Sequence, residues 1–209
     1  ALVFLDGVWL GGHDGGSTPF SIDLTEHLAS GRHRLQIMVE NRRRPDRVPM
    51  DHVDWFNWGG LYREVAILRL PAVHVRRASA ELRPDRATLR FAVTLSAPVD
   101  GTARVEIAEI GLSAEIPVVA GRGTIDVAAA VALWSPASPK LYDVEVSWRS
   151  DRFRDRIGFR TIEARGTRLF LNGEPIWLRG VCVHEDDLAL GKVSTEADVR
   201  RRFADAREL

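Results

Sequence analysis

Apolar and smaller or polar residues alternate with a period of two through the middle of the chain, and this pattern constrains the fold more than any other feature. Leu89, Phe91 and Val93 occupy alternate positions, so one face of this strand is expected to meet a core. Similar short runs recur between turn signals, and about seven strands in about ninety residues are typical of an immunoglobulin-like sandwich. We therefore predict such a β-sandwich over residues 71–164, without the cysteine pair of antibody domains.

The chain opens with a strong hairpin signal. Asp6-Gly7 stands between apolar runs at 3–5 and 8–10, and the favoured two-residue hairpin turn needs a positive φ at both central residues, which Asp-Gly tolerates. The first residues lack the basic flank and cleavage site of a signal peptide. They are interpreted as a strand already under way, which indicates that the natural N-terminus is missing.

The rest of the N-terminal segment is also predicted to form β structure. A period-two strand is expected at 34–39, with the apolar residues Leu35, Ile37 and Val39 on one buried face. A further strand is expected at 64–70. Pro71 interrupts the pattern there, so we predict a separate domain over residues 1–70.

The last stretch of the chain changes character. Asn172-Gly173 predicts a second hairpin, and the apolar run 178–183 predicts a strand buried on both faces. From Thr195, a candidate N-cap, the apolar period becomes helical. A buried strand followed by an amphipathic helix is half of a βαβ unit. Residues 165–209 are therefore interpreted as the start of a larger α/β domain, and the chain as the front of a longer protein.

Composition argues against several classes of partner. The chain has 29 Lys+Arg and 29 Asp+Glu, so no net charge attracts nucleic acid or an anionic membrane. The arginine run at 42–44 is interpreted as a solvated loop, because no stacking aromatics interleave with it. No apolar stretch reaches the roughly 20 residues of a membrane span. The single cysteine, Cys182, is expected to be a small buried hydrophobe. The lack of an internal disulfide framework suits a reducing compartment, here predicted to be the cytoplasm, or simply a disulfide-free fold.

Four stretches, in this order and at this spacing, resemble family 2 glycoside hydrolases of the β-galactosidase and β-glucuronidase kind. They are GGHDGGSTPF at 11–20, DWFNWGGLYREV at 54–65, LWSP with PKLY at 133–142, and FLNG with LRGVCVHED at 170–186. The resemblance implies a mostly β chain: a partial jelly-roll sugar-binding domain over 1–70 and an immunoglobulin-like sandwich over 71–164. It also implies the first βα unit of a truncated (β/α)8 barrel over 165–209.

The resemblance implies that the parent protein is a retaining exo-β-glycosidase acting on terminal β-galactosides or β-glucuronides. Retention needs two carboxyl groups about 5–5.5 Å apart. In the family both are glutamates on later barrel strands, the acid following an asparagine, and no Asn-Glu pair follows Asn172. No catalytic residue is therefore assigned to this chain, and the fragment alone is expected to be inactive. The alternatives are a non-catalytic carbohydrate-binding or structural module, and a β-mannosidase-type relative.

Three candidate substrate contacts lie in the second stretch. Asp54 matches a family aspartate that accepts hydrogen bonds from sugar hydroxyls. Without the motif, a loop aspartate that caps a turn would be the preferred interpretation; with the motif, sugar contact is preferred. Trp58, with its aromatic neighbours, is a candidate stacking wall, but aromatic residues of β domains more often belong to the core. Asn57 is a candidate donor to the same sugar.

Two further candidates, His184 and Glu185, follow the expected first barrel strand, at the end where (β/α)8 enzymes build their sites. His184 matches a family histidine that contacts the sugar; the alternative is a structural histidine. His-Glu-Asp supplies metal-ligand types, but neighbouring residues of a strand point to opposite faces, so no metal site is expected. No cofactor is expected either. The predicted partners are a β-glycoside and, in the longer protein, further copies of the same chain.

Overall fold

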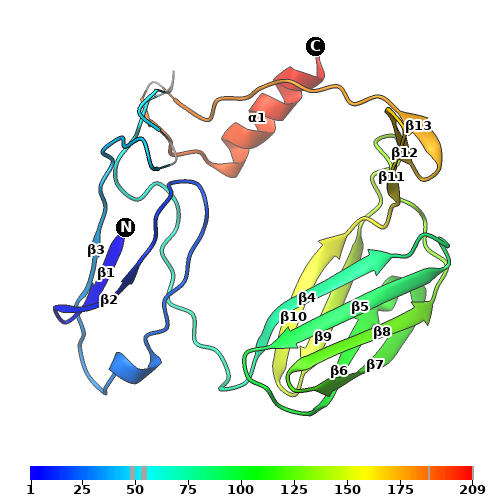
Figure 1. The fold of residues 1–209 in the computed structure, drawn as a ribbon, viewed down its shortest axis with the longest axis horizontal. Helices are drawn as coiled ribbons and strands as arrows, with labels where there is room; N and C mark the ends of the chain where they lie inside the picture. Colours follow the sequence, from blue (N-terminus) through cyan, green and yellow to red (C-terminus); the bar gives the residue numbers. More distant parts are fainter. Residues whose placement is uncertain (48–49, 53–55, 188, 209) are drawn as a thin grey trace. The chain divides into compact units, whose positions relative to one another are not determined.

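The computed structural model describes residues 1–47, 50–52, 56–187 and 189–208, shown from blue to red in Figure 1. The chain divides into two compact units. The first comprises Ala1–Ile67 together with Gly180–Leu209, and the second comprises Leu68–Arg179. Residues that follow the predicted barrel strand thus belong to the same unit as the N-terminal segment.

The second unit contains the predicted sandwich, drawn in green and yellow in Figure 1. Its seven antiparallel strands lie in the order β10-β9-β6-β7-β8-β5-β4. They are β4 (Val75–Leu82), β5 (Thr88–Leu95), β6 (Gly101–Ile107), β7 (Leu112–Val119), β8 (Arg122–Ala128), β9 (Tyr142–Trp148) and β10 (Asp151–Ile157). β7 and β8 pair through only two residue pairs next to their turn. The edge strands β4 and β10 approach each other, since the backbone N–H of Val75 donates to Asp151 Oδ2 at 2.6 Å. The sheet therefore folds over on itself and nearly closes.

The core of this unit has the residues that the alternation predicts. Leu89 and Phe91 are 0% exposed and Val93 is 2% exposed. Opposite them, β6 and β9 contribute Val105 and Trp148, which are also buried. The prediction of a seven-stranded β-sandwich is confirmed, because a period of two places one face of every strand in a shared core.

The second hairpin is also confirmed and is bonded to the sandwich. A small sheet joins β11 (Ile162–Arg165), β12 (Arg168–Leu171) and β13 (Glu174–Ile176). Asn172 and Gly173 form the β12–β13 turn with φ of 53° and 86°. The Asn172 side chain accepts a hydrogen bond from Thr161 N and donates one to Trp134 O, both at 3.0 Å. The turn residue thus also attaches the hairpin to its neighbours.

The first unit contains the three-stranded sheet β2-β1-β3. Its strands are β1 (Leu2–Leu5), β2 (Val8–Gly12) and β3 (Leu35–Met38), and a short 3-10 helix spans Thr25–His27. Asp6 and Gly7 have φ of 51° and 85°, so the predicted first hairpin is confirmed. Leu35 and Ile37 are half-buried as expected, whereas Val39 lies beyond β3 and is exposed.

Two predicted strands are absent from the structure, and the start of a (β/α)8 barrel is not confirmed. Residues 64–70 and 178–183 have no strand assignment and pair with no described strand. Ile67 and Leu178 are 70% and 69% exposed. A strand exists through hydrogen bonds to a neighbour, so an apolar run without a partner remains irregular. Cys182 lies in the second run and is exposed, which corrects the expectation that it is buried.

The predicted C-terminal helix is present and begins directly after its predicted N-cap, Thr195. α1 spans Glu196–Arg207, and Thr195 and Asp198 exchange hydrogen bonds in a complete capping box. This reciprocal bonding satisfies two backbone donors that the first turn leaves free. The apolar stripe predicted on the helix is largely uncovered, with Phe203 at 64% exposure. Among the described residues, no helix is both long and apolar enough to cross a bilayer.

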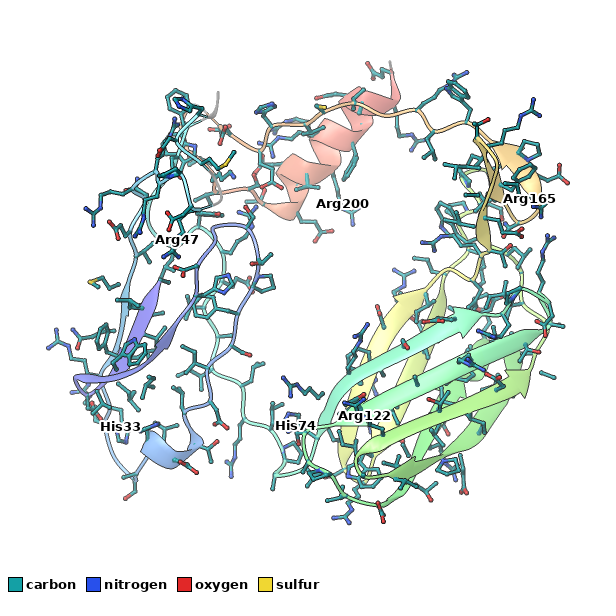
Figure 2. The ribbon with its side chains drawn as sticks, in the orientation of Figure 1. His33, Arg47, His74, Arg122, Arg165 and Arg200 are labelled. Atoms are coloured by element: carbon teal, nitrogen blue, oxygen red, sulfur yellow. The ribbon has the colours of Figure 1, made fainter. Side chains whose placement is uncertain are left out.

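The first hairpin carries a charged cluster that makes its stability depend on pH (His33 is labelled in Figure 2). Asp6 accepts hydrogen bonds from Arg34 N at 2.7 Å and from the His33 ring at 2.6 Å, and the other His33 ring nitrogen faces Ala29 O at 2.9 Å. The Asp6 carboxylate and the Ala29 carbonyl raise the pKa of His33. The Arg34 N–H and His33 lower the pKa of Asp6.

We expect the stabilisation from this cluster to be largest between about pH 4 and pH 6.5, the ordinary values of the two groups. The contribution of His33 is lost as pH rises through its raised pKa, and that of Asp6 is lost as pH falls through its lowered pKa. Urea midpoints of the wild type and His33→Gln should therefore differ most in this window and converge at alkaline pH. His27→Gln, at an exposed position, is the control. Equal differences at pH 5 and pH 9 would contradict the assignment.

Candidate functional site

The loop that follows residue 55 is held by a reciprocal pair of amides. The Asn57 side chain donates to Asn41 O, and the Asn41 side chain donates to Asn57 O at 3.0 Å. Gly59 passes so close that a Cβ there would lie 3.1 Å from Asn41 Nδ2. The amide nitrogen of Asn57 is therefore used within the protein, which leaves its side-chain oxygen as the free polar atom.

Trp58 connects this loop to the segment that follows the predicted barrel strand. Its Nε1 donates to Asp186 Oδ1 at 2.8 Å. Its ring lies against Gly191, where a Cβ would be 3.1 Å from Trp58 Cε3, and Gly191 has φ of 63°. The Phe56 and Trp58 ring centroids are 5.6 Å apart, and the rings are tilted by 49°. Trp58 thus joins two segments and still leaves 38% of its surface exposed.

Arg63 makes a second connection between the same segments. Its Nη2 donates to Glu185 Oε2 at 2.9 Å, and its Nη1 donates to Lys192 O at 2.8 Å. The guanidinium also lies over the Tyr62 ring at 5.3 Å. About half of each side chain in the Arg63–Glu185 pair is exposed (50% and 51%), so the contact with solvent keeps its electrostatic energy small.

A turn closed by Asp187 and Gly191 lies between these contacts. Asp187 and Gly191 exchange backbone hydrogen bonds of 2.8 and 2.9 Å. The Asp187 carboxylate accepts from the backbone N–H groups of Ala189 and Leu190, and these bonds lower its pKa. A carboxylate that accepts two backbone donors is held in its charged form, so Asp187 holds the backbone of Ala189 and Leu190 in place.

The backbone of Glu185 is also held from the helix side. Its carbonyl accepts hydrogen bonds from Ser194 Oγ at 3.4 Å and from Arg202 Nη2 at 3.2 Å. Arg202 lies on α1, and its Nη1 also donates to Ser194 Oγ at 3.0 Å. Helix and turn therefore share one hydrogen-bonded network around Glu185.

The glycine-rich loop at 11–20 joins the same unit. The His13 ring stacks on Phe20 with centroids 4.8 Å apart, and its Nε2 is 3.0 Å from Thr18 Oγ1. Arg47, labelled in Figure 2, pairs with Asp14, and this pairing lowers the pKa of Asp14. The Tyr62 hydroxyl donates to Gly16 O. Two of the four motif stretches, and residues 180–186 of the fourth, thus belong to the first unit.

The predicted site residues have different surroundings. Asp54 lies outside the described residues. His184 is exposed and forms no hydrogen bond, ion pair or ring contact with another described residue. Asn57, Trp58 and Glu185 each use one side-chain polar atom on a protein partner. Their contact with a sugar stays a prediction. No group of three or more His, Cys, Asp or Glu side chains within the described parts of the chain is placed to hold a metal ion.

Sequence reasoning missed three residues that build this site: Arg63, Asp186 and Gly191. Arg63 and Asp186 lie inside the motif stretches, and a basic residue in one stretch opposite an acidic pair in the other was the available signal. The partners are 122 and 128 positions apart in sequence, so their pairing cannot be read from local spacing.

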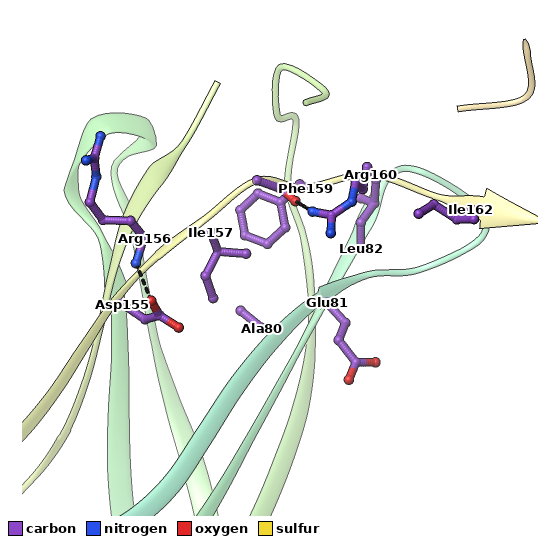
Figure 3. Close-up of a pocket in the computed structure, with 10 residues that line it drawn as sticks. Ala80, Glu81, Leu82, Asp155, Arg156, Ile157, Phe159, Arg160 and Ile162 are labelled. Atoms are coloured by element: carbon purple, nitrogen blue, oxygen red, sulfur yellow. Dashed lines mark hydrogen bonds between the residues drawn. The ribbon is translucent and has the colours of Figure 1, made fainter. Parts of the chain in front are cut away.

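A separate groove lies in the second unit, beside the ends of β4 and β10 (Figure 3). It has a volume of about 550 Å³ and is lined by residues 80–82, 155–160 and 162. Its polar groups bond to the local backbone: Arg160 donates to Gly158 O at 3.0 Å, and Arg156 N donates to Asp155 Oδ1 at 2.7 Å. Asn57, Trp58, His184 and Glu185, the predicted site residues that the structure describes, do not line this groove, so it is not the candidate site.

Comparison with known families gives two matches, in the order that the sequence motifs predict. Residues 1–71 match the family described as "Glycosyl hydrolases family 2, sugar binding domain". Residues 73–160 match the family described as "Glycosyl hydrolases family 2". Together the two matches cover most of the chain, and they confirm the resemblance drawn from the four stretches. Neither match extends past residue 160.

The individual relatives that the chain matches include β-glucuronidases and β-galactosidases. A β-glucuronidase of Paenibacillus borealis is 27% identical over 92% of this chain and 37% of its own length. A β-galactosidase of Klebsiella pneumoniae is 31% identical over 94% of this chain and 21% of its own length. The solved structure of a Ruminococcus gnavus β-glucuronidase in complex with D-glucaro-d-lactam superposes with a TM-score of 0.80 at 24% identity, covering 99% of this chain and 39% of that one. The chain thus spans well under half the length of each.

Proposed function

Because the chain belongs to glycosyl hydrolases family 2, we propose that it is the non-catalytic, sugar-contacting part of a retaining exo-β-glycosidase. The proposed substrates are terminal β-glucuronides or β-galactosides, the sugars named by its relatives. Retaining hydrolysis uses a carboxylic acid and a carboxylate nucleophile about 5–5.5 Å apart. Neither is assigned to this chain, whose part is to bind and orient the sugar.

One observation carries this proposal. The loop at 56–63, which lies in the segment matched to the sugar-binding domain, contacts the segment at 185–192 directly. The two motifs that resemble the family's substrate contacts are therefore held together in one compact unit. Such an arrangement places polar and aromatic groups side by side, as a sugar site requires.

The contacts of the candidates support two proposed roles. Neither ring nitrogen of His184 bonds to another described residue, so both can serve sugar hydroxyls, and the exposed rings of Phe56 and Trp58 suit stacking against a pyranose. Glu185 and Asp186, in contrast, bond to Arg63 and Trp58. We assign His184 to direct sugar contact, with Asp54 as a second predicted contact, and Glu185 to support of the site.

The test is hydrolysis by the product of the complete reading frame that encodes this chain. We expect it to cleave p-nitrophenyl β-D-glucuronide or β-D-galactoside, with retention at the anomeric carbon by proton NMR, and the 209-residue chain to cleave neither. Preferred cleavage of the β-D-mannoside would instead favour a β-mannosidase-type relative. No cleavage of any of the three would overturn the enzymatic proposal in favour of a non-catalytic module.

His184→Ala in that enzyme is expected to lower kcat/KM by about 10- to 100-fold, the effect of one or two lost hydrogen bonds to substrate. His27→Ala, on the short 3-10 helix, serves as the matched control and should leave kcat/KM unchanged. Unchanged kcat/KM in His184→Ala would show that His184 does not contact the sugar.

A further inference from the structure

We propose that Arg63 is a positioning residue that fixes the backbone carrying His184. This inference rests on the proposed function, in which His184 contacts the sugar. His184, Glu185 and Asp186 are consecutive, and the structure treats them differently. Glu185 and Asp186 are bonded to Arg63 and Trp58, while His184 has no partner among the described residues.

The two bonded residues restrain the segment in complementary ways. Glu185 and Asp186 are consecutive residues that bond to different partners, Arg63 and Trp58. A contact to Glu185 together with a contact to Asp186 therefore restrains the backbone against rotation, which one contact alone does not do. His184 is the next residue along, so its direction depends on both contacts.

Arg63 adds a restraint that Trp58 does not supply. Its two terminal nitrogens reach Glu185 Oε2 at 2.9 Å and Lys192 O at 2.8 Å. These acceptors belong to residues on either side of the turn closed by Asp187 and Gly191. One guanidinium therefore connects the two segments that flank this turn. A planar fork with two separate N–H groups suits this geometry, whereas the single ammonium group of lysine is a point charge on a flexible stem.

If Arg63 served only to stabilise the fold, its removal would lower the unfolding midpoint of the first unit. The Arg63–Glu185 pair is about half exposed, and ion pairs of this kind contribute little to global stability. Removal of Arg63 should therefore leave the unfolding midpoint almost unchanged. Only the segment around 185–192 should become less ordered, as expected when a positioning residue is removed.

The chain contains a matched control. Arg165 also bonds to a glutamate, Glu163, at 2.7 Å, and its guanidinium also lies over an aromatic ring, that of Phe170, at 4.5 Å (Figure 2). Its side chain is 54% exposed, close to the 50% of Arg63. Arg165 lies in the other compact unit, so Arg165→Met removes an arginine–glutamate pair and a cation–ring contact without touching the segment that carries His184.

The first measurement uses the chain itself. In Arg63→Met, amide exchange at Asp187 and Gly191, which hold the turn closed, is expected to accelerate by about five- to tenfold, with a shift of the Trp58 indole resonance and an almost unchanged unfolding midpoint. Arg63→Lys should restore part of the protection, and Arg165→Met should leave exchange in this turn at the wild-type rate. Unchanged exchange in Arg63→Met would overturn the proposal.

The second measurement uses the active enzyme of the longer reading frame. Arg63→Met is expected to lower kcat/KM by about tenfold, with Arg63→Lys between Arg63→Met and the wild type. Wild-type kcat/KM in Arg63→Met, despite faster exchange in the turn, would overturn the positioning role while the proposed function stood. An inactive wild-type enzyme would instead overturn the proposed function, and with it the link from Arg63 to a sugar contact.

Discussion

Phe91→Ala is expected to destabilise the sandwich by about 3–5 kcal/mol, the usual cost of deleting a fully buried aromatic side chain. Phe91 is 0% exposed and lies at the centre of β5. It is paired with Ala80 on β4 and with Ile125 on β8. Because strands flank it on both sides and the opposite layer covers its face, the core has little freedom to close over the missing ring.

The loss of stability in Phe91→Ala should be measured from the amide signals of β5 and β9 in a urea titration, because these signals report unfolding of the sandwich and not of the other unit. Val119→Ala is the control: Val119 is 69% exposed at the end of β7, so its replacement should change the midpoint little. A Phe91→Ala midpoint equal to that of Val119→Ala would contradict the packing described for β5.

Gly121→Ala is the second large effect, expected to destabilise the same unit by about 2–5 kcal/mol through left-handed strain and overpacking together. Gly121 has φ of 76°, and a Cβ there would lie 2.3 Å from Ala97 O and 3.2 Å from Pro98 Cα. Both are backbone atoms, so the clash cannot be relieved by a side-chain rotation. The loop must move, although Gly121 N and O both bond to it, through Val99 O and Leu95 N.

Gly111→Ala separates the two contributions. Gly111 also has a left-handed φ, 63°, but a Cβ there would meet no atom within 4 Å. Its replacement should cost only the conformational strain, about 1–2 kcal/mol. The difference between the urea midpoints of Gly121→Ala and Gly111→Ala therefore measures the destabilisation caused by the steric clash. Equal midpoints would show that the 95–99 loop moves aside without loss of stability.

The parts of the fold that the sequence predicts are those decided by nearby residues. The turns at Asp6-Gly7 and Asn172-Gly173 need only a residue pair that tolerates positive φ, and the Thr195 cap needs a hydroxyl and a carboxylate three residues apart. The runs at 64–70 and 178–183 have the composition of strands. Their state depends on partners elsewhere, and no described strand pairs with them.

The candidate site was predictable to a similar extent. The motifs identify the loop and the segment that meet, because both carry residue types suited to a sugar. The pairing of Arg63 with Glu185, and of Trp58 with Asp186, depends on how the chain brings together positions more than a hundred residues apart. Charge and aromatic character restrict the choices, but they leave many combinations of donor and acceptor.

The two hairpin turns differ in what chemical ageing of their first residue removes. Asp6 only accepts hydrogen bonds, from Arg34 and His33, while Asn172 both accepts and donates. In Asn-Gly and Asp-Gly sequences the glycine nitrogen can attack the preceding side-chain carbonyl to give a succinimide, with loss of ammonia from asparagine or of water from aspartate, and water then opens the ring to aspartate or isoaspartate. At residue 172 either product lacks the donor to Trp134 O, so the bond between the β12–β13 hairpin and the sandwich would weaken as the protein ages. The same reaction at Asp6 removes no hydrogen-bond donor.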